Sequence, residues 1–183
     1  MCSRYVTGWM LARSENALLA GVMFSETMAK HSISAGQLHV HMDRGSPMRA
    51  KHFVHLLADL GVTKSYSRPH VSNDNPYSES AFKTLKYRHD FPARFGSYEQ
   101  ALGWCKAFFP WYCFEHRHSG IAYHTPGDVY YGRTGAIDAR RAIVLNAAYT
   151  AHPERFVHKA PVPLELAPAV WINEPKEVTT STH

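Results

Sequence analysis

The sequence predicts an α/β fold, because strand-like and helix-like segments alternate along its N-terminal half. Residues 5–11, 37–42 and 62–67 are short runs rich in β-branched or alternating apolar side chains, which is typical of strands. The segments between them carry apolar residues at helical spacing. With 183 residues and 45% hydrophobic content, the chain can form one domain of ordinary size with an extension. Wholesale disorder is excluded.

The first helix is predicted over residues 14–31, where Ser14 can cap the start. Lys30 and His31 suit the negative end of that helix. A strand over residues 37–42 follows and ends directly before Asp43.

The second helix is predicted to begin with Ser46 as its cap and Pro47 in its first position, where the missing N–H costs least. Phe53 and Leu57 belong to its buried stripe, and Gly61 ends it before the strand over residues 62–67.

The rest of the chain is predicted to be mainly helical. Pro76 opens a helix that Asn75 caps and that packs through Phe82 and Leu85. A longer helix over residues 98–118 should be kinked or split by Pro110. Another follows over residues 138–151, before a proline-rich extended tail.

The charge balance and the cysteines restrict the class of protein. Lys plus Arg number 20 against 15 Asp plus Glu, and the pI near 9.2 suits a polyanionic partner without requiring one. Cys2, Cys105 and Cys113 form no C-x-x-C pair, which favours reduced thiols and a cytoplasmic location. We see neither a signal peptide nor a membrane-spanning run.

Two acidic residues stand where chemistry is expected. Asp43 lies at the carboxyl end of a predicted strand, where ligands collect in α/β sheets. Glu79 falls in the second turn of the helix opened by Pro76, and Lys83 and Lys86 share its face. Taken alone, this helix face is more typical of a solvated charged surface with ion pairs.

Asp43 and Glu79 are separated by 35 residues, and with the surrounding motifs they resemble the integrase-like transposases of bacterial insertion sequences. That family shares the catalytic core of retroviral integrases. The resembling motifs are Ser3-Arg4-Tyr5, Gly8-Trp9, His41-x-Asp43-x-Gly45-Ser46, Asp74-Asn75-Pro76, Glu79, Phe82-Lys83, Leu85-Lys86, Trp111-Tyr112, His116-Arg117-His118 and Thr125-Pro126.

The resemblance implies a ribonuclease H-like mixed sheet flanked by helices, whose carboxylates hold two Mg²⁺ (or Mn²⁺) ions for phosphodiester cleavage and strand transfer. It implies that Asp43 and Glu79 are catalytic metal ligands. His41 could line the site or simply pack on its strand, Asn75 could be only a helix cap, and Arg117 could be structural rather than DNA-facing. The residues expected to contact DNA are Lys83, Lys86, Asn75, Asn73, Arg44 and Arg117.

The family's first catalytic Asp would fall one position before Met1, so residues 1–133 are expected to be a core without its first strand. Residues 134–183 would form a C-terminal helix and an extended tail. We therefore expect a truncated, impaired transposase that acts on insertion-sequence ends and target DNA. The alternatives are a catalytically dead DNA-binding remnant that inhibits or pairs with intact transposase, and an unstable fragment. A homo-oligomer, or pairing with a full-length transposase, is implied by the family, and the protein would be cytoplasmic and associated with the nucleoid when bound to DNA.

A zinc site is the remaining alternative, since the chain has 13 histidines. His39 and His41, and His116 and His118, form H-x-H pairs. No cysteine joins them at zinc-finger spacing, so the sequence does not favour zinc.

Overall fold

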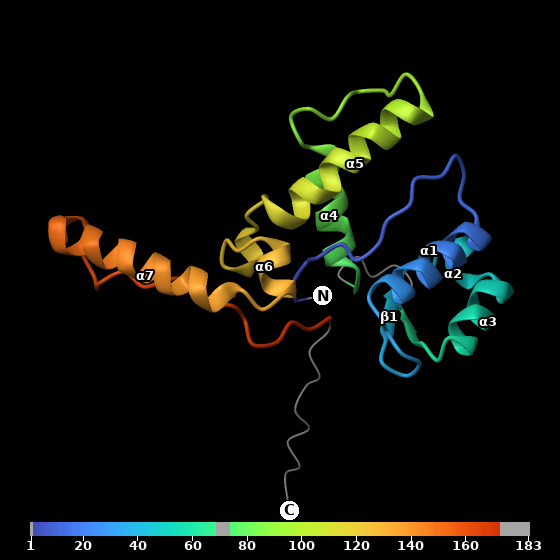
Figure 1. Ribbon diagram of the computed structural model, residues 1–183, viewed down its shortest axis with the longest axis horizontal. Coiled ribbons are helices and arrows are strands. Elements are labelled where there is room, and N and C mark those ends of the chain that lie inside the picture. Colours follow the sequence, from blue (N-terminus) through green and yellow to red (C-terminus); the bar gives the residue numbers. More distant parts are fainter. Residues whose placement is uncertain (1, 69–73, 173–183) are drawn as a thin grey trace, which may run out of the picture. The chain divides into compact units, whose positions relative to one another are not determined.

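The computed structural model describes residues 2–68 and 74–172, and these residues form two compact units. The first unit contains residues 2–6 and Arg94–Val170, and the second contains Thr7–Ala93 and residues 171–172. Figure 1 shows the course of the chain through its helices. The first unit is thus assembled from segments that are far apart in sequence.

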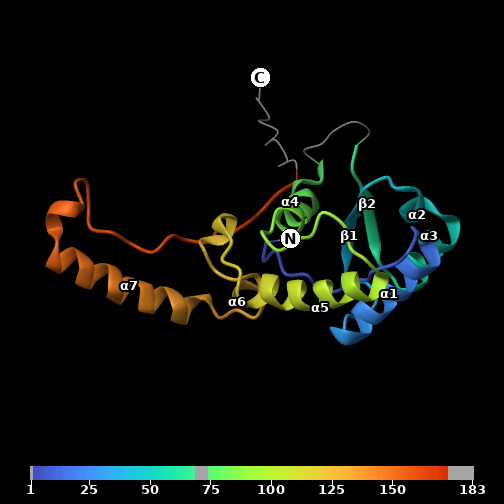
Figure 2. The same ribbon diagram turned by 90° about the horizontal axis from the view of Figure 1, so that it is seen from above.

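Two parallel strands lie at the centre of the second unit. β1 (His39–Met42) and β2 (Thr63–Tyr66) pair along their whole length, starting with His39 opposite Thr63. The two arrows lie side by side in Figure 2. Parallel neighbours need a crossover connection, and here it is helical. This arrangement agrees with the predicted α/β class.

Helices surround these strands. The crossover consists of α2 (Ser46–Arg49) and α3 (Lys51–Asp59), and α1 (Ala17–Lys30) packs against both. A further helix, α4 (Pro76–Lys86), follows β2. The buried core of this unit is made of Ala17, Met28, Met42, Phe53, Leu57 and Val62.

The predicted strand over residues 5–11 is wrong, because these residues adopt no regular structure. A strand needs a ladder partner, whereas this segment lies against α1. The Thr7 carbonyl is hydrogen-bonded to His31 Nε2 at 3.0 Å, and a Cβ at Gly8 would overlap the side chain of Thr27. Strand-forming side chains alone are not sufficient to form a strand where no neighbouring strand is available for pairing.

Two predicted helix starts also differ. α1 is capped by Asn16, whose Oδ1 accepts the Leu18 N–H at 2.8 Å, and not by Ser14. The helix predicted from Ser46 has its cap position at Gly45, and it breaks in two at Ala50, where ψ is 133°. Pro47 was predicted at the first helical position and lies at the second, still within the first turn.

The first unit is helical. Its elements are α5 (Tyr98–Phe114), the short η2 (Ser119–Ile121), α6 (Pro126–Tyr130), α7 (Thr134–Ala151) and η3 (Pro153–Arg155). α5 packs against α6, and aromatic rings stack along α5. The packed aromatic rings of this helix are Trp104, Phe108, Trp111 and Tyr112.

Three predictions for this unit need correction. α5 passes through Pro110 as one helix and ends at Phe114, because buried side chains on both sides of the proline hold it in place. α6 was not predicted, although Thr125 and Asp128 form a capping box at its start. α7 begins at Thr134, ahead of the predicted start.

None of the residues of α7 is buried, although Asp138 and Arg141 are only partly exposed. Within its unit it runs away from α6, as Figure 1 shows. Among the described residues, no helix is both long and apolar enough to cross a membrane.

Candidate functional site

Asp43 emerges from the carboxyl end of β1 and is exposed. Its Oδ1 accepts the backbone N–H of Gly45 at 2.9 Å, which forms a tight turn after the strand. A Cβ at Gly45 would come within 3.0 Å of that oxygen, so the turn favours glycine. The carboxylate is therefore presented to solvent at the strand end, as the sequence predicts.

His41 connects three elements beside this strand end. Its Nδ1 is hydrogen-bonded to Ser65 Oγ at 2.9 Å, and its Nε2 lies 3.2 Å from Ser67 Oγ and 3.0 Å from the Asp74 carbonyl oxygen. The ring is half-buried. His41 therefore links β1 to β2 and to the start of α4.

Asp74 fixes the start of α4, a role that sequence reasoning missed. Its side chain is 2% exposed and accepts three hydrogen bonds from Arg68, from the backbone N–H, Nε and Nη2, at 2.8–2.9 Å. These bonds and the negative charge of Asp74 raise the pKa of Arg68. The signal in the sequence was an acid directly before Asn75-Pro76, with an arginine shortly upstream.

α4 carries the second group of predicted residues. Glu79 lies in its first turn, not the second, and Lys83 and Lys86 lie in its last turn; all three are exposed. Asn75 occupies the cap position, but its side chain makes no capping hydrogen bond. Phe82, predicted to pack, is 62% exposed. No residue of α4 is buried.

The other predicted residues are more dispersed. The Arg44 guanidinium donates through Nε to the Ser67 carbonyl at 2.9 Å, close to the end of β2. Arg117 belongs to the other unit, where its Nη1 donates to the Tyr123 carbonyl at 3.3 Å. Asn73 lies outside the described residues. The second unit thus contains Asp43, Glu79, Lys83, Lys86, Asn75, Arg44 and His41.

A pocket of about 390 Å³ opens beside Asp43 in the second unit. Glu15 lines it together with Asp43, and Met10, Met23 and Met48 give it apolar walls. Nothing in the spacing of Glu15 and Asp43 indicates that they share a pocket. In residues 2–68 and 74–172, no three His, Cys, Asp or Glu side chains are grouped so that they could hold a metal ion.

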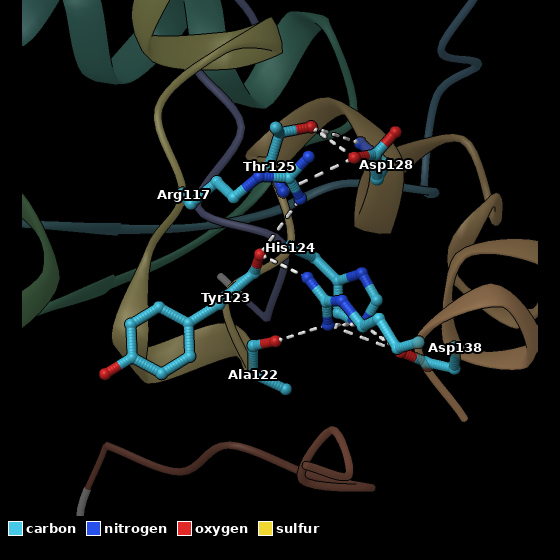
Figure 3. Close-up of polar contacts among 8 residues, drawn as sticks. Arg117, Ala122, Tyr123, His124, Thr125, Asp128 and Asp138 are labelled. Carbon is cyan, nitrogen blue, oxygen red and sulfur yellow. Dashed lines mark hydrogen bonds and ion pairs between the residues drawn. The ribbon is translucent and has the colours of Figure 1, made fainter. Parts of the chain in front are cut away.

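A second polar cluster in the first unit involves Arg117 and is drawn in Figure 3. Fully buried His124 lies 3.1 Å from Asp138 Oδ1, and Arg141 Nη1 lies 3.3 Å from the same oxygen. Arg141 also donates to the carbonyls of Ala122 and Tyr123, at 2.8 and 2.6 Å. This cluster therefore ties α7 to the turn before α6.

Comparison with known proteins connects these features. The family model described as "Integrase core domain" matches residues 60–126, a range that includes Asp74, Glu79, Lys83 and Lys86. The transposase for insertion sequence element IS904 of Lactococcus lactis subsp. lactis (strain IL1403) is 30% identical over 127 residues. That alignment covers 69% of this chain and 50% of the relative. Residues 60–126 are thus similar to an integrase core, and 127 residues of the chain are similar to an insertion-sequence transposase.

One solved catalytic core domain shows a similar fold. The catalytic core domain of BIV integrase gives a TM-score of 0.50 at 24% identity, over 73% of this chain and 82% of that one. The simian T-cell lymphotropic virus intasome, in complex with PP2A regulatory subunit B56 gamma, gives 0.41 at 15% identity, over 57% and 36%. The chain spans about half the length of the IS904 transposase.

The integrase-core match extends through both compact units. It begins at Leu60, before β2, and ends at Pro126, the first residue of α6. It therefore includes the whole of α4 and α5, whereas Asp43 lies on the N-terminal side of the matched range. The metal-ligand and DNA-contact roles of the individual residues remain predictions.

Proposed function

We propose that this chain is the DNA-processing core of an insertion-sequence transposase, acting by metal-dependent phosphodiester cleavage and strand transfer at the ends of the element. One observation carries the proposal. His41 and Arg68 both bond to Asp74, directly before α4, so the helix that bears Glu79 starts beside the strand end that bears Asp43. Ligand-binding groups collect at this edge of α/β sheets.

In this proposal, Asp43 and Glu79 hold Mg²⁺ or Mn²⁺ ions. The donor set fits, because both side chains are carboxylates and Mg²⁺ prefers oxygen ligands and retains several waters. One Asp43 oxygen is used by Gly45, and the Glu79 carboxylate has no hydrogen bond or ion pair with any described residue. A pair of such ions would activate an attacking hydroxyl and stabilise the leaving oxygen.

The basic and polar residues around the carboxylates would position the DNA. Lys83 and Lys86 lie on the face of α4 that carries Glu79, so they can neutralise phosphates beside the reacting group. Asn75 and Asn73 precede that helix and Arg44 follows Asp43, whereas Arg117, in the other unit, is not assigned to this DNA surface. The proposed fold is ribonuclease H-like with a C-terminal extension, and the proposed assembly is a homo-oligomer on DNA or a pairing with a full-length transposase.

A double-mutant cycle on metal binding tests the shared site. Asp43→Asn and Glu79→Gln should each weaken Mn²⁺ binding by about tenfold or more, measured by calorimetry on the full chain. The double variant should lose little more than either single variant, because an ion that has lost one ligand gains less from the other. Glu26→Gln on α1, also exposed, is the matched control and should bind as the wild type does.

If the losses of Mn²⁺ affinity in the two single variants add up in the double variant, the carboxylates do not share an ion. A loss of Mn²⁺ affinity in Glu26→Gln as large as in the other variants would also contradict a shared ion. A cleavage and joining assay on a labelled DNA end with Mg²⁺ then separates the two functional alternatives. Product formation supports the transposase core. DNA binding without product supports a catalytically dead remnant that pairs with intact transposase.

Salt dependence tests the DNA surface. Lys83→Ala and Lys86→Ala should each reduce the slope of log affinity against log salt by about 1, because each removes one phosphate contact. At 0.1 M salt this amounts to about eightfold weaker binding of a duplex, measured by fluorescence anisotropy. Lys51→Ala, exposed on α3, should leave the slope unchanged. Equal effects of all three would point to diffuse charge rather than a contact surface on α4.

A further inference from the structure

A groove of about 710 Å³ runs along α7 in the first unit. One side is the face of α7, and the other is the extended segment of residues 162–164. The turn that contains Ala122 and Tyr123 closes one end. The full lining is Arg117, Ala122, Tyr123, Ile137, Arg140, Arg141, Val144, Leu145, Val162, Pro163 and Leu164, and none of these residues is acidic.

The groove carries positive charge that its own surroundings do not neutralise. Arg141 is paired with Asp138 at 3.3 Å and so contributes little. Among the described residues, Arg117 donates to the Tyr123 carbonyl and forms no ion pair, which leaves its charge uncompensated. Arg140 is exposed, and no described acidic side chain forms an ion pair with it. Two guanidinium groups are therefore available to bind carboxylates, for which their planar donors are well suited.

The groove also has apolar lining residues that are exposed to solvent. Val144 is 67% exposed, Val162 66% and Leu164 58%, and α7 buries no residue of its own. Isolated helices of this length are marginal in water, because most helix stability comes from packing an apolar face. Exposed branched side chains along an unpacked helix are typical of a binding surface.

We propose that this groove docks a short segment of a partner protein in which carboxylates alternate with apolar side chains. Arg117 and Arg140 bind the carboxylates, while Val144, Val162 and Leu164 cover the apolar side chains. A nucleic-acid backbone fits less well, because phosphates give the three apolar residues nothing to pack against. A second copy of the chain fits less well too, since a two-fold interface would bring Arg140 against its own equivalent.

Fluorescence anisotropy on the full chain tests the docking. The probe is a short labelled peptide of alternating glutamate and leucine, and it should bind the groove. A peptide with glutamine in place of glutamate, and one with serine in place of leucine, should each bind at least about tenfold more weakly, because each lacks one of the two kinds of contact.

Two pairs of variants locate the binding on the groove. Val144→Ser should weaken the glutamate–leucine peptide by about tenfold, because burying a valine is worth roughly one decade in affinity. Ile143→Ser is the matched control: it has the same helical context and 69% exposure but does not line the groove, so binding should stay within about twofold. Arg140→Glu should weaken binding by about tenfold, and Arg155→Glu, in η3 and outside the groove, should not.

Several results would overturn the proposal. Equal losses in Val144→Ser and Ile143→Ser would show that the peptide binds elsewhere. Equal affinity for the serine-substituted peptide would show charge attraction without docking. If a DNA duplex displaces the peptide, and Val144→Ser also weakens binding of the duplex, the groove would be assigned to nucleic acid. Self-association that Val144→Ser abolishes, measured by sedimentation, would assign it to a second copy.

Discussion

Replacing Arg141 by alanine should lower the free energy of unfolding by about 3 kcal/mol. Ala122 and Tyr123 have φ values of 53° and 55°, a left-handed conformation that costs energy in residues other than glycine. The Arg141 guanidinium holds both carbonyls of this turn, and Ala122 is only 7% exposed. Without that guanidinium, a buried carbonyl loses its donor and the strained turn loses its support.

Urea denaturation of the full chain measures the loss, and Arg140→Ala is the matched control. Arg140 is the preceding residue of α7, it is exposed, and none of the described polar side chains pairs with it. Its replacement should change the free energy of unfolding by less than about 0.5 kcal/mol. Equal losses in Arg140→Ala and Arg141→Ala would mean that the helix, rather than the anchored turn, determines the effect. Arg141→Lys should be intermediate, because an ammonium cannot reach both carbonyls in the same fork.

The sequence predicted those elements whose signals are local. β1 was recognisable from alternating apolar residues, β2 from its place between Gly61 and Arg68-Pro69, and the start of α4 from Asn75-Pro76. The capping box of α6 was also present in the sequence, as Thr125 and Asp128, and could have been found.

Other features depend on tertiary contacts that local patterns do not contain. Residues 5–11 have strand-forming side chains, yet packing of Gly8 on Thr27 keeps them irregular. The break at Ala50 reflects the turn between α2 and α3, since alanine itself favours helix. The contacts of Arg141 with a turn almost twenty residues upstream could not be read from spacing.

The candidate site shows the same division. The positions of Asp43 at a strand end and of Glu79 on a helix were predicted from the sequence. What the sequence did not show is how α4 is held beside the strands, because the buried pairing of Asp74 with Arg68 depends on how the intervening loop folds. Asp74 thus has a structural role, whereas Asp43 and Glu79 are exposed and are the proposed metal ligands.

The family match also bears on the division of the chain. The integrase-core range of residues 60–126 begins in the second unit and ends in the first, so each unit contains part of the core. α7 follows that range, but Arg141 and Asp138 attach its first half to the core through His124. The proposed extension from residue 134 therefore begins as an integral part of the first unit.

Arg68→Ala is expected to lower the free energy of unfolding, because it removes two of the donors that stabilise the buried Asp74 carboxylate. The Asp74 carboxylate is 2% exposed. Of the three hydrogen bonds that residue 68 donates to it, the variant keeps the one from the backbone N–H and loses the two from the guanidinium. A buried charge with too few donors is strongly unfavourable. Urea denaturation should show the loss, whereas Arg49→Ala, exposed on α2 in the same unit, should remain within about 0.5 kcal/mol of wild type.

Removing the acid as well separates the ion pair from a simple loss of packing. If the uncompensated carboxylate causes the damage, Arg68→Ala combined with Asp74→Ala should be more stable than Arg68→Ala alone, because no buried charge remains. A double variant that is less stable still would show that Asp74 acts mainly through bonds other than those to Arg68. In either variant, α4 loses its fixed start beside β1. The Mn²⁺ coupling between Asp43 and Glu79 should then shrink even where each carboxylate is intact, because two ligands share an ion only while their elements are held together.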